Sequence, residues 1–144
     1  MTKTKTKILS AVAVVFLCFW ATGFSSSLLS SHCLKPKLDI QKKIAACNFA
    51  SATTLSRYFE ADHPEYAALE FERAIALAEG GDSQKAHIVM RDLLEWASID
   101  KTSQATGNRR DDRVADEVFS RARRLDRNSV AFWVFAQAMG FDGV

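Results

Sequence analysis

Apolar residues recur three or four positions apart along most of the chain after residue 39. This spacing is the period of a helix that buries one face, and no stretch of the sequence shows the strict alternation of a half-buried strand. The sequence therefore predicts an all-α fold, with antiparallel helical hairpins arranged as a short solenoid or as a helical bundle.

Residues that cap helices divide these stretches. Asp39 can cap the first helix, and Asp62-His63-Pro64-Glu65 combines a capping carboxylate with a proline in the first turn, where proline loses no hydrogen bond. Gly80-Gly81-Asp82 supplies a glycine stop followed at once by a new cap. Asn128 or Ser129 is the expected cap of the last helix.

The two central helices differ in how their apolar residues are spread. The helix that ends at Glu79 carries them on more than one face, so we expect neighbours on several sides. The helix that follows Asp82 carries a single stripe. Because only three residues join the two, they are expected to form an antiparallel pair. Polar residues from Ile99 to Asp111 predict a loop before the next helix.

The N-terminal segment has a different pattern. Lys3, Lys5 and Lys7 precede Ile8–Trp20, which is almost continuously apolar. A basic start, an apolar run and then small residues is the layout of a secretory signal. The alternative is an uncleaved anchor, because residues 8–24 reach the short limit for crossing a bilayer and allow a membrane association.

These patterns divide the chain into two parts. Residues 1–27 are interpreted as a signal peptide or N-terminal membrane anchor, and residues 33–144 as a helical repeat-like domain. We expect this domain to be exported, either periplasmic or secreted. If the anchor is retained, the domain would be held at the inner membrane, outside the cytoplasm.

Cys33 and Cys47 form an even pair once the apolar run with Cys18 is set aside. Disulfides persist in exported proteins, so we expect these two cysteines to be bridged. The alternative is two unpaired side chains, with Cys47 merely buried. No cysteine and histidine spacing typical of a zinc site occurs.

No residue pattern predicts chemistry. His32, His63 and His87 have no spaced carboxylate or thiol partner, and each is expected at the surface. We therefore expect no catalytic residues, no metal and no cofactor. The net charge of +2 falls to −1 without the three N-terminal lysines, which gives no global attraction to nucleic acid.

Two C-terminal features are candidates for partner contacts. The run from Arg109 to Arg127 holds seven arginines and five acids, which is typical of a solvated helix face with internal ion pairs or of a patch for an anionic partner. The last helix brings four aromatic residues close together, most of which we expect to fill the core: Phe132, Trp133, Phe135 and Phe141. From charge and aromatic exposure, our speculative contact residues are Arg121, Arg124 and Trp133.

A small residue followed four positions later by a bulky one recurs in three helices, at Ala45/Phe49, Ala86/Met90 and Ala115/Phe119. The intervals between the alanines are 41 and 29 residues, which average 35 and lie near the roughly 34-residue period of tetratricopeptide repeats. The stretch Glu72–Ala86 resembles the helix–turn–helix joint of that family, and Asp39 to Cys47 resembles the start of exported tetratricopeptide-like and Sel1-like proteins. Members of the family are helical solenoids that bind peptides or proteins on a concave face. The resemblance implies the same here, although a plain helical bundle stays open.

The sequence thus leads us to expect a non-catalytic scaffold that binds a protein or peptide partner. A membrane-anchored helical subunit of an envelope complex is one alternative. An exported enzyme or inhibitor whose site the sequence does not reveal is another.

Overall fold

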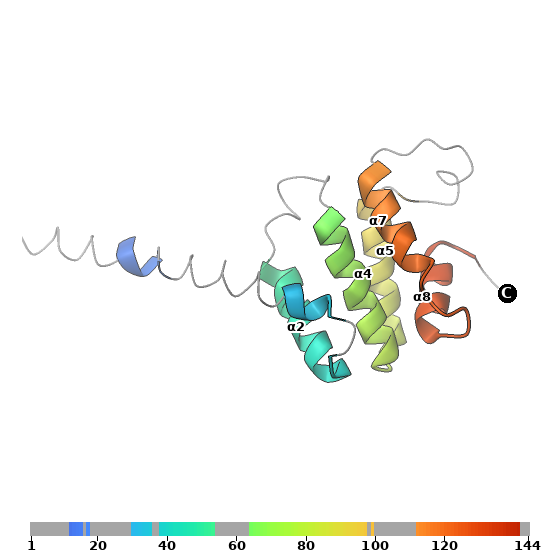
Figure 1. The fold of residues 1–144 in the computed structure, drawn as a ribbon, viewed down its shortest axis with the longest axis horizontal. Helices are drawn as coiled ribbons and strands as arrows, with labels where there is room; N and C mark the ends of the chain where they lie inside the picture. Colours follow the sequence, from blue (N-terminus) through green and yellow to red (C-terminus); the bar gives the residue numbers. More distant parts are fainter. Residues whose placement is uncertain are drawn as a thin grey trace, which may run out of the picture.

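The computed structural model of the chain describes residues 12–15, 17, 30–35, 38–53, 64–97, 99 and 112–141. These residues form helices and turns, and none of them lies in a strand. The principal helices, drawn in Figure 1, are α2 (Ile40–Thr53), α4 (Pro64–Glu79), α5 (Ser83–Trp96), α7 (Asp112–Ala122) and α8 (Val130–Ala138). The predicted all-α class is confirmed.

Helix α4 is the centre of the fold. It packs against α2, α5, α7 and α8, and eleven of its sixteen residues are buried. Figure 1 shows α2 on one side of α4 and the remaining helices on the other. This arrangement confirms that the spread of apolar residues around this helix requires neighbours on several sides.

The main core lies between α4 and the three helices that follow it. Its largest fully buried side chains are Phe71 of α4, Met90 of α5, and Val114 and Val118 of α7, each at most 1% exposed. Burial of a side chain of this size contributes about 1.5–3 kcal/mol relative to its exposure. The single stripe predicted for α5 is confirmed, because Ala86, Met90 and Leu93 face this core.

The turn between α4 and α5 ends one helix and begins the next. The amide of Gly81 donates to the carbonyl of Ala78 and the amide of Asp82 to that of Leu77, the pair of bonds that closes a Schellman motif. Gly81 has a φ of +91°, which strains any residue with a Cβ. Asp82 then caps α5 by accepting a hydrogen bond from the Lys85 amide at 3.2 Å. The glycine stop and the cap are therefore both present.

The cysteine pair lies in a second, smaller core. Cys33 and Cys47 form a disulfide, as the sequence favours, with Cα atoms 4.8 Å apart. Both side chains are fully buried, next to Ala50 of α2 and Leu69 of α4. The bridge joins the short helical segment around Cys33 to α2, whose first turn is capped by Asp39 through the Lys42 amide.

The C-terminal helix divides its aromatic residues between the core and the surface. Ser129 caps α8 by accepting from the Phe132 amide at 3.1 Å. Phe135 packs on the core, with its ring centroid 6.0 Å from that of Phe71. Trp133 and Phe141 are 36% and 47% exposed. The expectation that most of these aromatics fill the core is wrong, because the core face of this nine-residue helix is taken up by small side chains and one ring.

The residues of the three-helix pattern do not have equivalent roles. Ala86 and Met90 are fully buried, and Ala115 is 3% exposed. In α2, however, Ala45 is exposed and Phe49 is 42% exposed. The buried face of α2 is instead the one that carries Cys47, because the disulfide and α4 lie on that side.

The apolar N-terminal run is described only at residues 12–15 and 17. Val12, Val14, Val15 and Leu17 are 56–68% exposed and belong to neither core. Within the residues that the structure describes, no helix combines the length and hydropathy needed to cross a bilayer. The predicted loop from Ile99 to Asp111 and the capping turn at Asp62-His63 lie outside the described residues, apart from Ile99, which is buried.

Candidate functional site

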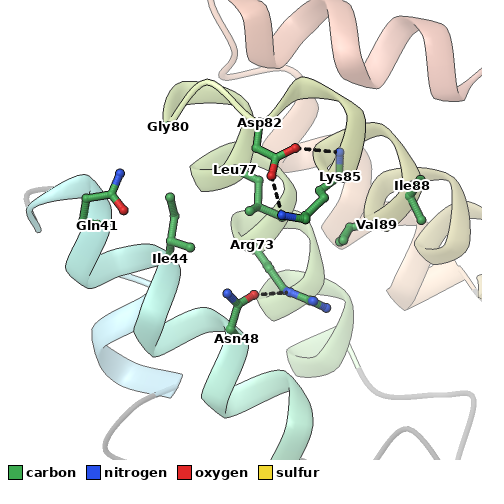
Figure 2. Close-up of a pocket in the computed structure, with 10 residues that line it drawn as sticks. All are labelled: Gln41, Ile44, Asn48, Arg73, Leu77, Gly80, Asp82, Lys85, Ile88 and Val89. Atoms are coloured by element: carbon green, nitrogen blue, oxygen red, sulfur yellow. Dashed lines mark hydrogen bonds and ion pairs between the residues drawn. The ribbon is translucent and has the colours of Figure 1, made fainter.

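A groove with a cavity volume of ≈ 550 Å³ lies between α2 and α5, with α4 behind it. Figure 2 shows Ile44 of α2 on one side and Ile88 and Val89 of α5 on the other. Its lining residues are Gln41, Ile44, Asn48, Arg73, Leu77, Gly80, Asp82, Lys85, Ile88 and Val89. The groove exists because α2 and α5 both pack on α4 from different sides.

The closest approach of α2 to the end of α4 occurs at Gly80. A Cβ built on Gly80 would lie 2.7 Å from Cδ1 of Ile44 and 3.1 Å from the carbonyl oxygen of Ala76. A residue without a side chain therefore lets Ile44 reach the end of α4. This contact closes one end of the groove with apolar atoms.

The apolar surface of the groove is only partly covered. Ile44 and Val89 are half-buried and pack against the main core, whereas Ile88 is 41% exposed. Ile88 lies outside the apolar stripe of α5, so its exposure is a consequence of the helical period. The three side chains present apolar surface to any segment that enters the groove.

Arg73 is the polar centre of the groove. Its Nε donates to Oδ1 of Asn48 at 2.8 Å, and its Nη1 donates to Oγ of Ser51 and to Oε2 of Glu70, both at 3.1 Å. These bonds hold the guanidinium between α2 and α4, and Figure 2 shows the one to Asn48. The Nδ2 group of Asn48 and the amide of Gln41 have no partner among the described residues, so both can pair with a ligand.

One ion pair lies at the end of the groove. Lys85 Nζ lies 2.7 Å from Oδ2 of Asp82. Hydrogen bonds from the side chain and the backbone amide of Lys85 lower the pKa of the Asp82 carboxyl below its ordinary value of 3.8. The pair is exposed to solvent, so it shapes the end of the groove more than it stabilises the fold.

The candidate contact residue Arg121 lies in an ion-pair network and not in the groove. Its Nη1 is 2.7 Å from Oε1 of Glu72 and its Nε is 2.7 Å from Oε1 of Glu117. Lys43, whose side chain is 9% exposed, reaches the other oxygen of Glu72 at 2.7 Å. The network joins α2, α4 and α7, which gives Arg121 a structural role within the fold.

The other two sequence candidates lie on the surface. Arg124 is exposed in the turn after α7, and Trp133 of α8 stacks edge-on against Phe132 at a centroid distance of 6.0 Å. Neither lines the groove. Sequence reasoning missed the groove because its walls, α2 and α5, bring together lining residues that are 37 to 48 positions apart along the chain. Only the off-stripe Ile88 gave a local signal.

The histidines and acids of the described chain form no metal site. His32 is exposed and His87 half-buried, while His63 lies outside the described residues. No group of three or more metal-ligating side chains occurs within the described ranges.

No family model, curated protein or solved structure matches the chain.

Proposed function

We propose that the chain is an exported, non-catalytic scaffold whose groove between α2 and α5 binds a peptide segment of a partner protein. The observation that carries the proposal is the exposed apolar surface of Ile88, in a groove also lined by the Gln41 amide and by Asn48, whose Nδ2 group has no partner among the described residues. Apolar surface provides affinity, and a few placed polar groups provide orientation.

A peptide fits this site better than an isolated apolar ligand. The Gln41 amide offers both a donor and an acceptor, and Asn48 adds the donor Nδ2, which together match the groups of a peptide backbone. A groove walled by two helices also suits an amphipathic segment that lays its apolar side chains between them. The resemblance to tetratricopeptide repeats, in which a concave helical face binds peptides, agrees with this assignment. In the same proposal α4 and α5 form one antiparallel hairpin of a short, degenerate array.

The test is a peptide selection on the disulfide-bonded protein. A random peptide library displayed on phage is selected against the immobilised protein, and the recovered peptides are measured on Ile88→Glu. Val130→Glu is the matched control, because Val130 is 51% exposed and lies outside the groove. We expect peptides that lose at least about tenfold in affinity on Ile88→Glu, since a charge would be buried against apolar atoms, and little on Val130→Glu. Recovery of no peptides, or equal binding to both variants, would contradict the proposal.

Arg121, Arg124 and Trp133, none of which lines the groove, remain proposed contacts. Arg121→Ala should also weaken the fold, because Glu72 loses a charged partner. Arg124→Ala and Trp133→Ala should leave stability nearly unchanged. A partner that binds all three variants as it binds the native protein would exclude this surface.

Export is supported by the basic and apolar start and by the buried disulfide, since disulfides persist outside the cytoplasm. Intact mass of the native protein, with and without reduction, tests it. A mass that begins within residues 24–28 and gains about two units on reduction agrees with a cleaved signal. A full-length mass in the membrane fraction would favour the anchored subunit.

A further inference from the structure

A second, smaller pocket shares Arg73 and Val89 with the groove. It has a cavity volume of ≈ 90 Å³ and is otherwise lined by Tyr66, Glu70, Asp92, Leu93 and Trp96. Its walls are α4 and α5. Because two residues line both cavities, the smaller pocket adjoins the groove.

The unusual group in this pocket is the Glu70 carboxylate. Glu70 is 5% exposed, and its Oε2 accepts from Arg73 Nη1 at 3.1 Å. Its other oxygen, Oε1, is buried and has no hydrogen-bond partner. A buried carboxylate oxygen without a donor is unfavourable. Glu70 lines the pocket, but its Oε1 is closed to solvent, so the carboxylate has to turn toward the cavity to meet a donor that a ligand brings.

We propose that this pocket binds the ammonium group of a lysine side chain from the segment that occupies the groove. The inference rests on the proposed function for the segment and names the chemistry that anchors it. An ammonium group carries three donors and one positive charge, which satisfies Oε1 of Glu70. The alkyl stem packs on the apolar surface of Val89 and Leu93.

The charges and rings of the pocket favour a cation. The lining residues include two carboxylates, Glu70 and Asp92, and one guanidinium, that of Arg73. Asp92 is exposed and also lies 3.5 Å from Arg91, so Glu70 is the carboxylate that a cation would meet inside the pocket. Arg73 is also held by acceptors on α2. Tyr66 and Trp96 lie with ring centroids 4.8 Å apart and planes at 72°, and aromatic faces attract cations.

A lysine end suits the pocket better than a metal ion. Hard divalent cations require six or more oxygen ligands or retained water, whereas two walls here are aromatic. The cavity of ≈ 90 Å³ equals the volume of about three water molecules, which accommodates the last few atoms of a lysine side chain.

The first arm of the test uses n-butylammonium chloride and the full folded protein. We expect saturable shifts of the Trp96 indole and Leu93 methyl resonances in nuclear magnetic resonance spectra, with no such shifts from potassium chloride or n-butanol. Glu70→Gln should weaken binding at least about tenfold by removing the charge-assisted bond. Glu79→Gln, on the exposed end of the same helix, should leave it unchanged.

A second variant covers the case in which Glu70→Gln fails to fold. Trp96→Leu keeps an apolar side chain but removes the ring, and should weaken butylammonium binding about threefold or more, read at Leu93. Equal responses to butylammonium and potassium, or unchanged affinity in both variants, would overturn the proposal and leave water as the occupant.

The second arm separates this inference from the proposed function. Lysine-containing peptides that bind the groove are compared with versions in which norleucine replaces lysine. The lysine pocket is supported if norleucine lowers the affinity of the peptide for the native protein but not for Glu70→Gln. Peptides that depend on Ile88 but bind equally with norleucine would overturn the pocket and keep the groove, whereas Glu70-dependent butylammonium binding without any peptide binding would overturn the groove alone.

Discussion

Replacement of Cys33 and Cys47 by alanine should destabilise the fold by about 3 kcal/mol. The cysteines are 14 positions apart, and a closed loop of this length restricts the unfolded chain by about 3 kcal/mol at 25 °C. Truncation adds little, because each substitution removes a single sulfur atom from the small cluster with Ala50 and Leu69. The loop closure is therefore the dominant contribution.

The loss should first be evident in α2. Helix α2 packs mainly on α4, and neither cysteine belongs to the main core that α4 forms with α5, α7 and α8. Besides this packing, α2 is held to α4 by the Lys43–Glu72 ion pair and by the bonds of Arg73 to Asn48 and Ser51. Amide hydrogen exchange of α2 in the double variant should accordingly accelerate more than that of α5.

The assay is urea unfolding followed by far-ultraviolet circular dichroism, with the native protein measured with and without dithiothreitol. Reduction and the double substitution should give the same loss, and dithiothreitol should not change the double variant. A double variant within about 0.5 kcal/mol of the oxidised native protein, the range of ordinary surface substitutions, would refute the loop-closure reasoning.

Three further predictions concern helices α4 and α5 and the turn between them. Gly81→Ala should lower the free energy of unfolding, measured in urea, by about 1–2 kcal/mol because Gly81 has a positive φ. Replacement of the exposed Glu79 by alanine should change that free energy little. Equal effects of the two substitutions would contradict the strain argument. Asp82→Asn keeps the cap but removes the charge. The pKa of the Asp82 carboxyl is lowered in the folded protein, so the ionised group stabilises the fold above pH 3.8. This stabilisation is lost as the pH falls through the folded pKa. The difference between native and variant unfolding midpoints should therefore shrink below pH 3.8, and a constant difference would be inconsistent with the shift. Met90→Ala should lower the free energy of unfolding by about 2–5 kcal/mol because it leaves a cavity. Ile88 is 41% exposed on the same helix, so Ile88→Ala should lower it far less. Similar unfolding midpoints for the two variants would show that Met90 is not tightly packed.

Local sequence information determined the helix ends of this protein. Asp39, Asp82 and Ser129 act as caps, and Gly81 ends α4, because capping is a contact between residues two to five positions apart. The apolar period likewise predicted that α4 would be surrounded and that α5 would bury one stripe. The cysteine pairing, predicted from the even cysteine count and the expected export, is present.

Only the tertiary structure decided which surfaces meet. The bonds of Arg73 to Asn48 and of Arg121 to Glu72 join residues 25 and 49 positions apart, and no local pattern specifies them. The same holds for α2, where packing on α4 buried Cys47 and left Phe49 exposed. The groove and the unpartnered oxygen of Glu70 arise from the placement of α2 and α5 around α4. Periodicity fixes which face of a helix is apolar, but side-chain complementarity between distant helices fixes where that face lies.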